Sequence, residues 1–102
     1  MKSLEQIRRQ LVAGEFEFSR HALKRAVERN ISETEIRDAA KNAELIEDYP
    51  QDKYSPSCLI FGLTKDNRPM HIQVSYADTE RVRIITLYEP DPEEWINNRE
   101  RR

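Results

Sequence analysis

Cysteine, glycine and long hydrophobic runs are all scarce in this chain of 102 residues. The single cysteine, Cys58, excludes an internal disulfide and a cysteine metal site, and it is typical of a reduced intracellular protein. Two glycines are too few for a glycine-rich phosphate loop, and no Walker or dinucleotide motif is present. No apolar run reaches the roughly 18 residues of a membrane helix, and the N-terminus, MKSLEQIRRQ, is charged where a signal peptide is apolar. We therefore expect a cytoplasmic protein without a membrane segment.

An excess of charge of one sign is also missing, because 17 basic and 19 acidic residues leave a net charge of −2. This balance excludes a uniformly cationic nucleic-acid coat and an acidic disordered tail. The charge is nevertheless uneven. Residues 1–30 hold 7 basic against 4 acidic side chains, residues 31–60 hold 3 against 7, and residues 61–102 hold 7 against 8. Any basic surface must therefore be local and is expected near the front of the chain.

Apolar periodicity and capping residues predict a single α+β domain over residues 1–102. Ser3, Ser19 and Ser32 each precede a helical pattern, and Gly14 and Asn30 are suited to left-handed helix ends. The predicted helices cover residues 4–13, 20–29, 33–43 and 92–100, and the predicted strands cover residues 45–49, 58–64, 70–77 and 82–89. Segregated elements of this kind indicate helices packed on one face of a four-stranded antiparallel meander, with residues 14–19 as a further candidate edge strand.

The strands predicted near the C-terminus carry polar side chains on one face. Alternation in strand 70–77 places His71 opposite the apolar residues, together with Gln73 and Ser75. If the helices cover the apolar face, this polar strip lies open to solvent. Alternation in strand 82–89 predicts Ile84, Thr86 and Tyr88 on one face, and Arg83, Ile85 and Leu87 on the other. Phe61 and Trp95 are expected in the core, the latter as an anchor of the last helix.

The helix predicted at residues 20–29 carries a cationic row. His21, Arg25 and Arg29 follow one another at single-turn spacing, with Lys24 on the same side. A histidine that exchanges protons near neutral pH beside guanidinium groups suits a phosphate ligand. The alternative is a solvated helix face on which Glu28 pairs with Lys24 or Arg25.

Together these features predict a groove for single-stranded RNA, with histidine as acid or base, arginine on phosphate and tyrosine stacked on a base. The alternative for His71 is a structural histidine bonded within the sheet. Neither HxH nor HxxxH spacing occurs, so no metal and no cofactor is expected, and Cys58 is expected in the core. The candidate catalytic residues are His21, Arg25, His71 and Tyr88, and the candidate substrate-binding residues are Lys24, Arg29 and Thr86.

Several motifs together resemble a prokaryotic family, domain of unknown function 4258, over about residues 4–95. They are the segment FSRHA with its downstream RNI, the segment EDYP, the strand RPMHI, and ITLYEPD with the following tryptophan. The family pattern S-x-H-A-x-x-R falls on Ser19, His21, Ala22 and Arg25. The downstream R-x-I falls on Arg29 and Ile31, the strand histidine on His71, and T-x-Y on Thr86 and Tyr88.

The resemblance implies a distant similarity to RelE-like toxins, which are small metal-independent ribonucleases with helices followed by an antiparallel sheet. It therefore implies RNA cleavage by attack of the ribose 2′-hydroxyl, and an antitoxin or other protein partner. The chain departs from typical RelE-like toxins because it is slightly acidic where those are strongly basic. The alternative is a non-catalytic protein-interaction module of the same fold, with a homodimer as one form of it.

Overall fold

The computed structural model describes all 102 residues, Met1–Arg102, as three short helices on a five-stranded mixed sheet followed by a small hairpin. The helices are α1 (Leu4–Val12), α2 (Arg20–Glu28) and α3 (Glu33–Lys41). The sheet has the order β1-β5-β4-β3-β2. Its strands are β1 (Phe16–Phe18), β2 (Glu44–Tyr49), β3 (Ser57–Leu63), β4 (Pro69–Ser75) and β5 (Val82–Tyr88).

The α+β class is confirmed, but the prediction of a four-stranded antiparallel sheet is wrong. Strands β2 to β5 pair antiparallel in chain order, as expected for a meander. A fifth strand, β1, pairs parallel with β5 at the sheet edge and makes the sheet mixed. The alternating segment between Gly14 and Ser19 forms this strand.

Local capping chemistry determines where the helices begin and end. The hydroxyl oxygens of Ser3, Ser19 and Ser32 each accept a hydrogen bond from a backbone N–H of the first turn. Gly14 and Asn30 have φ values of 78° and 54°, the left-handed conformation that ends a helix. These features are all predictable because the groups involved lie within a few residues of one another. None of the helices is long and apolar enough to cross a lipid bilayer.

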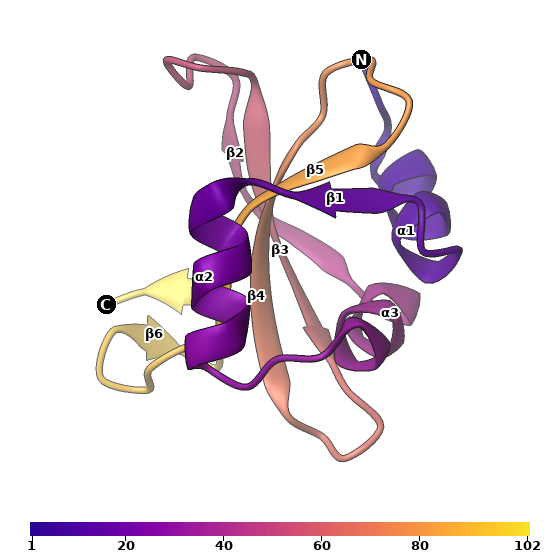
Figure 1. Cartoon of the computed structure of the whole chain (residues 1–102). Helices are drawn as coiled ribbons and strands as arrows, with labels where there is room; N and C mark the ends of the chain where they lie inside the picture. The colour runs from indigo at the N-terminus through magenta and orange to yellow at the C-terminus, as the bar shows by residue number, and fades with distance from the viewer.

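The core lies between the sheet and helices α1 and α3, which cover one face (Figure 1). Helix α3 approaches β3 most closely at Gly62, where an added Cβ would stand 2.0 Å from the carbonyl oxygen of Ala39. The opposite face is partly covered by the C-terminal hairpin, and α2 runs beside β5 (Figure 1). The two faces of the sheet therefore meet different elements, and only one of them receives the helices α1 and α3.

The predicted C-terminal helix at residues 92–100 is wrong. A single helical turn begins at Asp91, whose carbonyl accepts the N–H of Trp95, and the chain then forms β6 (Trp95–Ile96) and β7 (Glu100–Arg101). Asn97 and Asn98 have φ values of 52° and 62°, so the helix cannot continue. Asparagine tolerates this left-handed backbone better than other side chains, which favours a tight turn here. Trp95 is buried as predicted, but from a strand.

A β-bulge changes the predicted faces of β5. The register against β4 shifts in the middle of the strand, so that the alternation skips one residue near Ile85. Ile84 and Leu87 are both fully buried on the core face, whereas strict alternation places them on opposite faces. Thr86 and Tyr88 consequently turn to the face that carries the hairpin.

Candidate functional site

Helix α2 is attached to the part of the β5 edge that β1 does not reach. The Ser19 N–H donates to the carbonyl of Ile84 at 2.9 Å, and its hydroxyl donates to that of Ile85 at 3.0 Å. At the other end of the helix, the Arg29 guanidinium donates to the carbonyl of Leu87 at 2.8 Å. These bonds hold the helix against the strand at both ends. They therefore determine the position of α2 and its side chains along β5.

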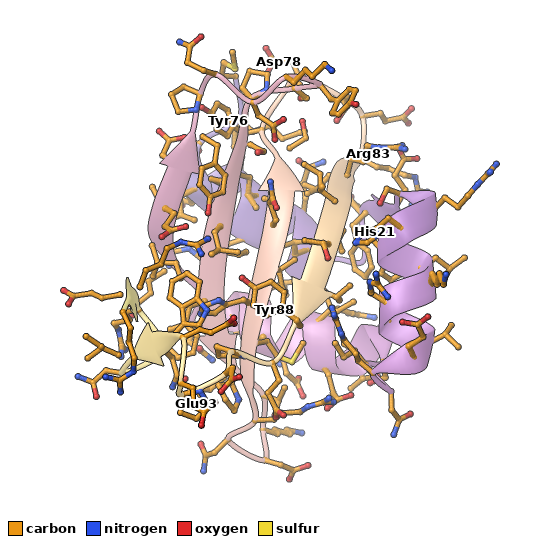
Figure 2. All side chains as sticks on the ribbon, turned by 90° about the vertical axis from the view of Figure 1, so that its left-hand side faces the viewer. His21, Tyr76, Asp78, Arg83, Tyr88 and Glu93 are labelled. Atoms are coloured by element: carbon orange, nitrogen blue, oxygen red, sulfur yellow. The ribbon has the colours of Figure 1, made fainter.

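His21 is exposed and makes no hydrogen bond within the chain. It lies on α2 on the hairpin side of the molecule, which it shares with Arg83 and Tyr88 of β5 (Figure 2). The helical spacing places Arg25 and Arg29 on the turns that follow. The term α2–β5 surface denotes here His21, Arg25, Arg29, Arg83, Thr86 and Tyr88. Arg83 pairs with Glu17 of β1 at 3.4 Å, and both side chains are half exposed.

Arg25 is occupied by a neighbouring carboxylate. Its guanidinium lies 2.7 Å from the carboxylate of Glu28, and this hydrogen bond lowers the pKa of Glu28, with Coulombic contributions from Arg25, Lys24 and Arg29. The solvated-face interpretation predicted this pair. Lys24 is exposed and has no ion pair within the chain. Because the Arg25 pair is itself solvent-exposed, an incoming phosphate can compete for the guanidinium at little cost.

Arg29 and Tyr88 share a cleft of about 530 Å³. The Arg29 guanidinium lies 6.0 Å from the centre of the Tyr88 ring, at the outer limit of a cation–π contact. The cleft also contains Arg68, Glu89, Asp91 and Glu94. With two guanidinium groups against three carboxylates, the cleft is not itself a strong anion site.

Arg68 was missed as a functional candidate, and the structure gives it a structural role. It lies 2.9 Å from the carboxylate of Glu35 and 3.3 Å from that of Glu89. It also donates to the carbonyls of Arg29 and Asn30, which terminate α2. The position of Arg68 beside Pro69 at a strand start gives no local signal of these contacts, because every partner is distant in the chain.

His71 is completely buried, so the prediction of an open polar strip is wrong at this position. Its Nε2 lies 2.7 Å from the carbonyl of Asn98 in the hairpin turn, and its Nδ1 lies 3.3 Å from the Tyr88 hydroxyl. Because a carbonyl only accepts, Nε2 carries the proton and Nδ1 accepts from Tyr88. Burial lowers the pKa of His71, partly opposed by the bond to Asn98, and the neutral ring is therefore favoured.

Aromatic rings and ion pairs close the hairpin over His71. The ring centres of Trp95, Tyr88 and Phe61 lie 4.4, 5.3 and 5.8 Å from that of His71, all edge to face. Arg99 and Arg101 of the hairpin reach back to β2, pairing with Glu44 at 2.5 Å and with Glu47 at 2.9 Å. The structural alternative for His71 accounts for these contacts, and a substrate has no access to its ring in this conformation.

Ser75 and Thr86 were also predicted on the polar face of the sheet. Ser75 is also buried, and its hydroxyl contacts that of Ser55 at 2.6 Å. Thr86 is half buried and lies opposite Gln73 in the ladder. Four of the predicted site residues thus lie on the hairpin side: His21, Arg29, Thr86 and Tyr88. No hydrogen bond or ring contact joins His21 to His71.

No group of three or more His, Cys, Asp or Glu side chains is arranged to hold a metal ion. Cys58 is buried in β3 on the core face, where burial raises its pKa to about 12, with a smaller effect from Asp48. A thiol with this pKa remains protonated near neutral pH and is a poor nucleophile. The prediction of a core cysteine is confirmed.

Comparison with known proteins gives a family but no functional relative. No curated protein and no solved structure is detectably similar to the chain. The sequence matches one family from residue 18 to residue 89, a segment that contains α2, α3 and β2 to β5 but neither α1 nor the C-terminal hairpin. Ser19, His21, Arg25, Arg29, His71, Thr86 and Tyr88 all lie inside the matched segment. The chain belongs to the family described as Domain of unknown function (DUF4258).

Proposed function

We propose that this protein is a toxin-like, metal-independent ribonuclease that binds RNA on the α2–β5 surface. The observation that carries the proposal is the exposed, unbonded His21 at the head of a helix whose following turns carry Arg25 and then Arg29, with Arg29 beside Tyr88. The proposal places the protein in the cytoplasm with its RNA substrate, and it includes an antitoxin-like protein partner. A distant relationship to RelE-like toxins is part of this proposal, and it implies the same metal-independent chemistry.

Binding rests on two kinds of contact. Arg25 leaves Glu28 for a phosphate oxygen, and a guanidinium binds phosphate through two parallel N–H groups. Tyr88 is half buried and presents its ring at the rim of the cleft that it shares with Arg29, so that a base can stack there. Few cations contribute, which predicts a short binding site and a moderate salt dependence.

In the proposed reaction, His21 acts as the general base. It takes the proton of the ribose 2′-hydroxyl, and the 2′-oxygen forms a bond to the adjacent phosphorus. The bond from phosphorus to the 5′-oxygen breaks, and that oxygen takes a proton from water. Arg25 and Arg29 stabilise the negative charge that develops on the phosphate oxygens. The products are a 2′,3′-cyclic phosphate and a 5′-hydroxyl end.

His71 enters this mechanism as a positioning residue. Both of its ring nitrogens are bonded and the ring is buried, so it does not touch the RNA. Because its Nδ1 accepts a hydrogen bond from the Tyr88 hydroxyl, it orients the tyrosine ring at the rim of the cleft. This positioning role replaces the catalytic role expected of His71 from the sequence.

The test is cleavage of single-stranded RNA oligonucleotides, with and without ribosomes, by the purified protein. We expect products with 2′,3′-cyclic phosphate ends, and a loss of about 10²-fold or more in rate for the double variant Arg25→Ala/Arg29→Ala. Arg81→Ala is the matched control because Arg81 is exposed in the turn before β5 and has no ion pair. Absence of cleavage under both conditions, or equal rates for the double variant and the control, contradicts the proposal.

A second candidate function is a non-catalytic protein-interaction module. It is favoured by two large apolar side chains on α2, Leu23 and Val27, which are 53% and 74% exposed and lie one helical turn apart. Replacement of both by serine separates the two candidates. A ribonuclease that uses the α2–β5 surface retains its cleavage rate, whereas an interaction module loses partner binding or self-association.

A further inference from the structure

A second cleft, of about 520 Å³, is lined by residues of α1 and α3. These two helices lie on the face of the sheet opposite the hairpin (Figure 1). Its apolar lining, here called the floor, consists of Val12 and Ala13 at the end of α1 and Ala40 of α3. Arg8, Arg9 and Lys41 also line the cleft, and Glu5 is the only carboxylate in the lining. The term α1–α3 groove denotes this cleft. It is distinct from the α2–β5 surface, and the two share no residue.

The groove exists because α3 presents small side chains toward its neighbours. Ala39 and Ala40 are both buried, and α3 lies close to β3 at Gly62. Alanines fill little of the space between two helices, so a shallow trough with an apolar floor remains above them. Such a trough accepts apolar side chains from outside the chain.

Two of the three cations of the groove lack a partner within the protein. Neither Arg8 nor Arg9 takes part in an ion pair, and Lys41 contacts Asp38 only at 3.7 Å. The Nε of Arg8 is the one buried side-chain polar atom in the chain that has no hydrogen-bond partner. Most arginines elsewhere in the chain find an acceptor, as Arg25, Arg29, Arg37, Arg68, Arg83, Arg99, Arg101 and Arg102 do. Buried polar groups are normally satisfied, so Arg8 is an arginine whose hydrogen-bonding capacity is left unused within the chain.

We propose that the α1–α3 groove binds an acidic amphipathic segment of a partner protein. The apolar floor receives the hydrophobic side chains of that segment, and its carboxylates meet Arg8, Arg9 and Lys41. Nucleic acid fits less well, because no aromatic side chain lines the groove and bases would have no ring to stack on. The proposal is independent of the ribonuclease activity, since α1 lies outside the segment matched by the family and on the other side of the sheet.

The probe is a synthetic helical peptide of about 20 residues with leucine at i and i+4 and glutamate at most other positions. It is titrated into isotopically labelled protein, and binding is followed by backbone amide chemical shifts. We expect saturable shifts confined to α1 and α3. Affinity should fall at least tenfold when the glutamates are replaced by glutamine and when salt is raised, because part of the attraction is between the peptide carboxylates and the cations of the groove.

Charge reversal on the protein completes the test. Arg9→Glu and Lys41→Glu alter exposed side chains and are expected to fold normally, and each should weaken peptide binding at least fivefold. Arg81→Glu is the matched control and should bind as the wild type does. The proposal is overturned if no saturable binding occurs, if the glutamine peptide binds equally well, if the control weakens binding as much, or if a single-stranded RNA shifts the same amides instead.

Discussion

The two histidines of this chain have opposite surroundings. His21 is exposed on the first turn of α2 without a hydrogen bond, whereas His71 is buried, with both ring nitrogens bonded and three aromatic rings around it. The same side chain is therefore open to a ligand in one place and enclosed, with its pKa lowered by burial, in the other. Residue type alone does not distinguish the two positions. The comparison shows that the covering element, here a hairpin of a few residues, decides which histidine is available for chemistry.

The largest expected effect is on the rate of RNA cleavage, and it concerns His21. His21→Ala should lower the rate of RNA cleavage by about 10²- to 10⁴-fold, since it removes the proposed general base. Its free energy of unfolding should change by less than about 0.5 kcal/mol because the side chain is exposed. Cleavage assays and urea unfolding on the same preparation measure both quantities. Full activity in His21→Ala would end the assignment of this residue as the base.

The loss of stability is expected to be larger for the substitution of His71 than for that of His21. His71→Ala should lower the free energy of unfolding by about 3 kcal/mol, because it leaves a cavity among three rings and removes two hydrogen bonds. Urea denaturation of His71→Ala and His21→Ala gives the comparison directly. Equal stability of the two variants would show that the hairpin does not depend on His71.

A smaller effect concerns the link between the buried histidine and the surface. Tyr88→Phe keeps the ring but removes the hydroxyl that donates to His71, and it should cost about 1 kcal/mol of unfolding free energy. Tyr54→Phe is the control, since Tyr54 is 88% exposed in the loop between β2 and β3. Thermal or urea unfolding distinguishes them, and a stability loss of the same size in both would remove the argument for a specific hydrogen bond.

The smallest expected effect is a dependence of stability on pH. Because burial lowers the pKa of His71 from 6.5, the unfolded chain takes up a proton below that pH that the folded protein does not. Unfolding free energy should therefore fall as the pH is lowered from about 7.5 to about 5.5, a range in which most carboxylates stay ionised. His71→Gln should flatten this dependence and His21→Gln should keep it. A dependence that survives in His71→Gln belongs to other groups.

Local signals in the sequence predicted the helices α1, α2 and α3. Ser3, Ser19 and Ser32 cap helices whose first residues are at most a few positions away, and Gly14 and Asn30 end them through their own backbone preference. The strands of the meander also followed from short apolar runs. Such features need no knowledge of distant partners, so they are accessible from a single sequence.

The features that were missed depend on distant contacts or on competition between local signals. Asp91 does start a helical turn, but two asparagines at positive φ divert the chain into a hairpin. The burial of His71 then follows from that hairpin and from the pairing of Arg101 with Glu47, 54 residues away. The bulge in β5 likewise has no mark in the sequence. The candidate residues on α2 stay a prediction, whereas the predicted accessibility of His71 is wrong.

The attachment of α2 to β5 has a consequence for the behaviour of variants. The carbonyls of Ile84, Ile85 and Leu87 accept hydrogen bonds from Ser19 and Arg29, so the helix occupies an edge that would otherwise offer free backbone groups to another strand. The helix that carries the candidate site also protects the sheet from self-association. Substitutions that unfold α2 are therefore expected to reveal themselves first as aggregation, before any change in chemistry can be measured.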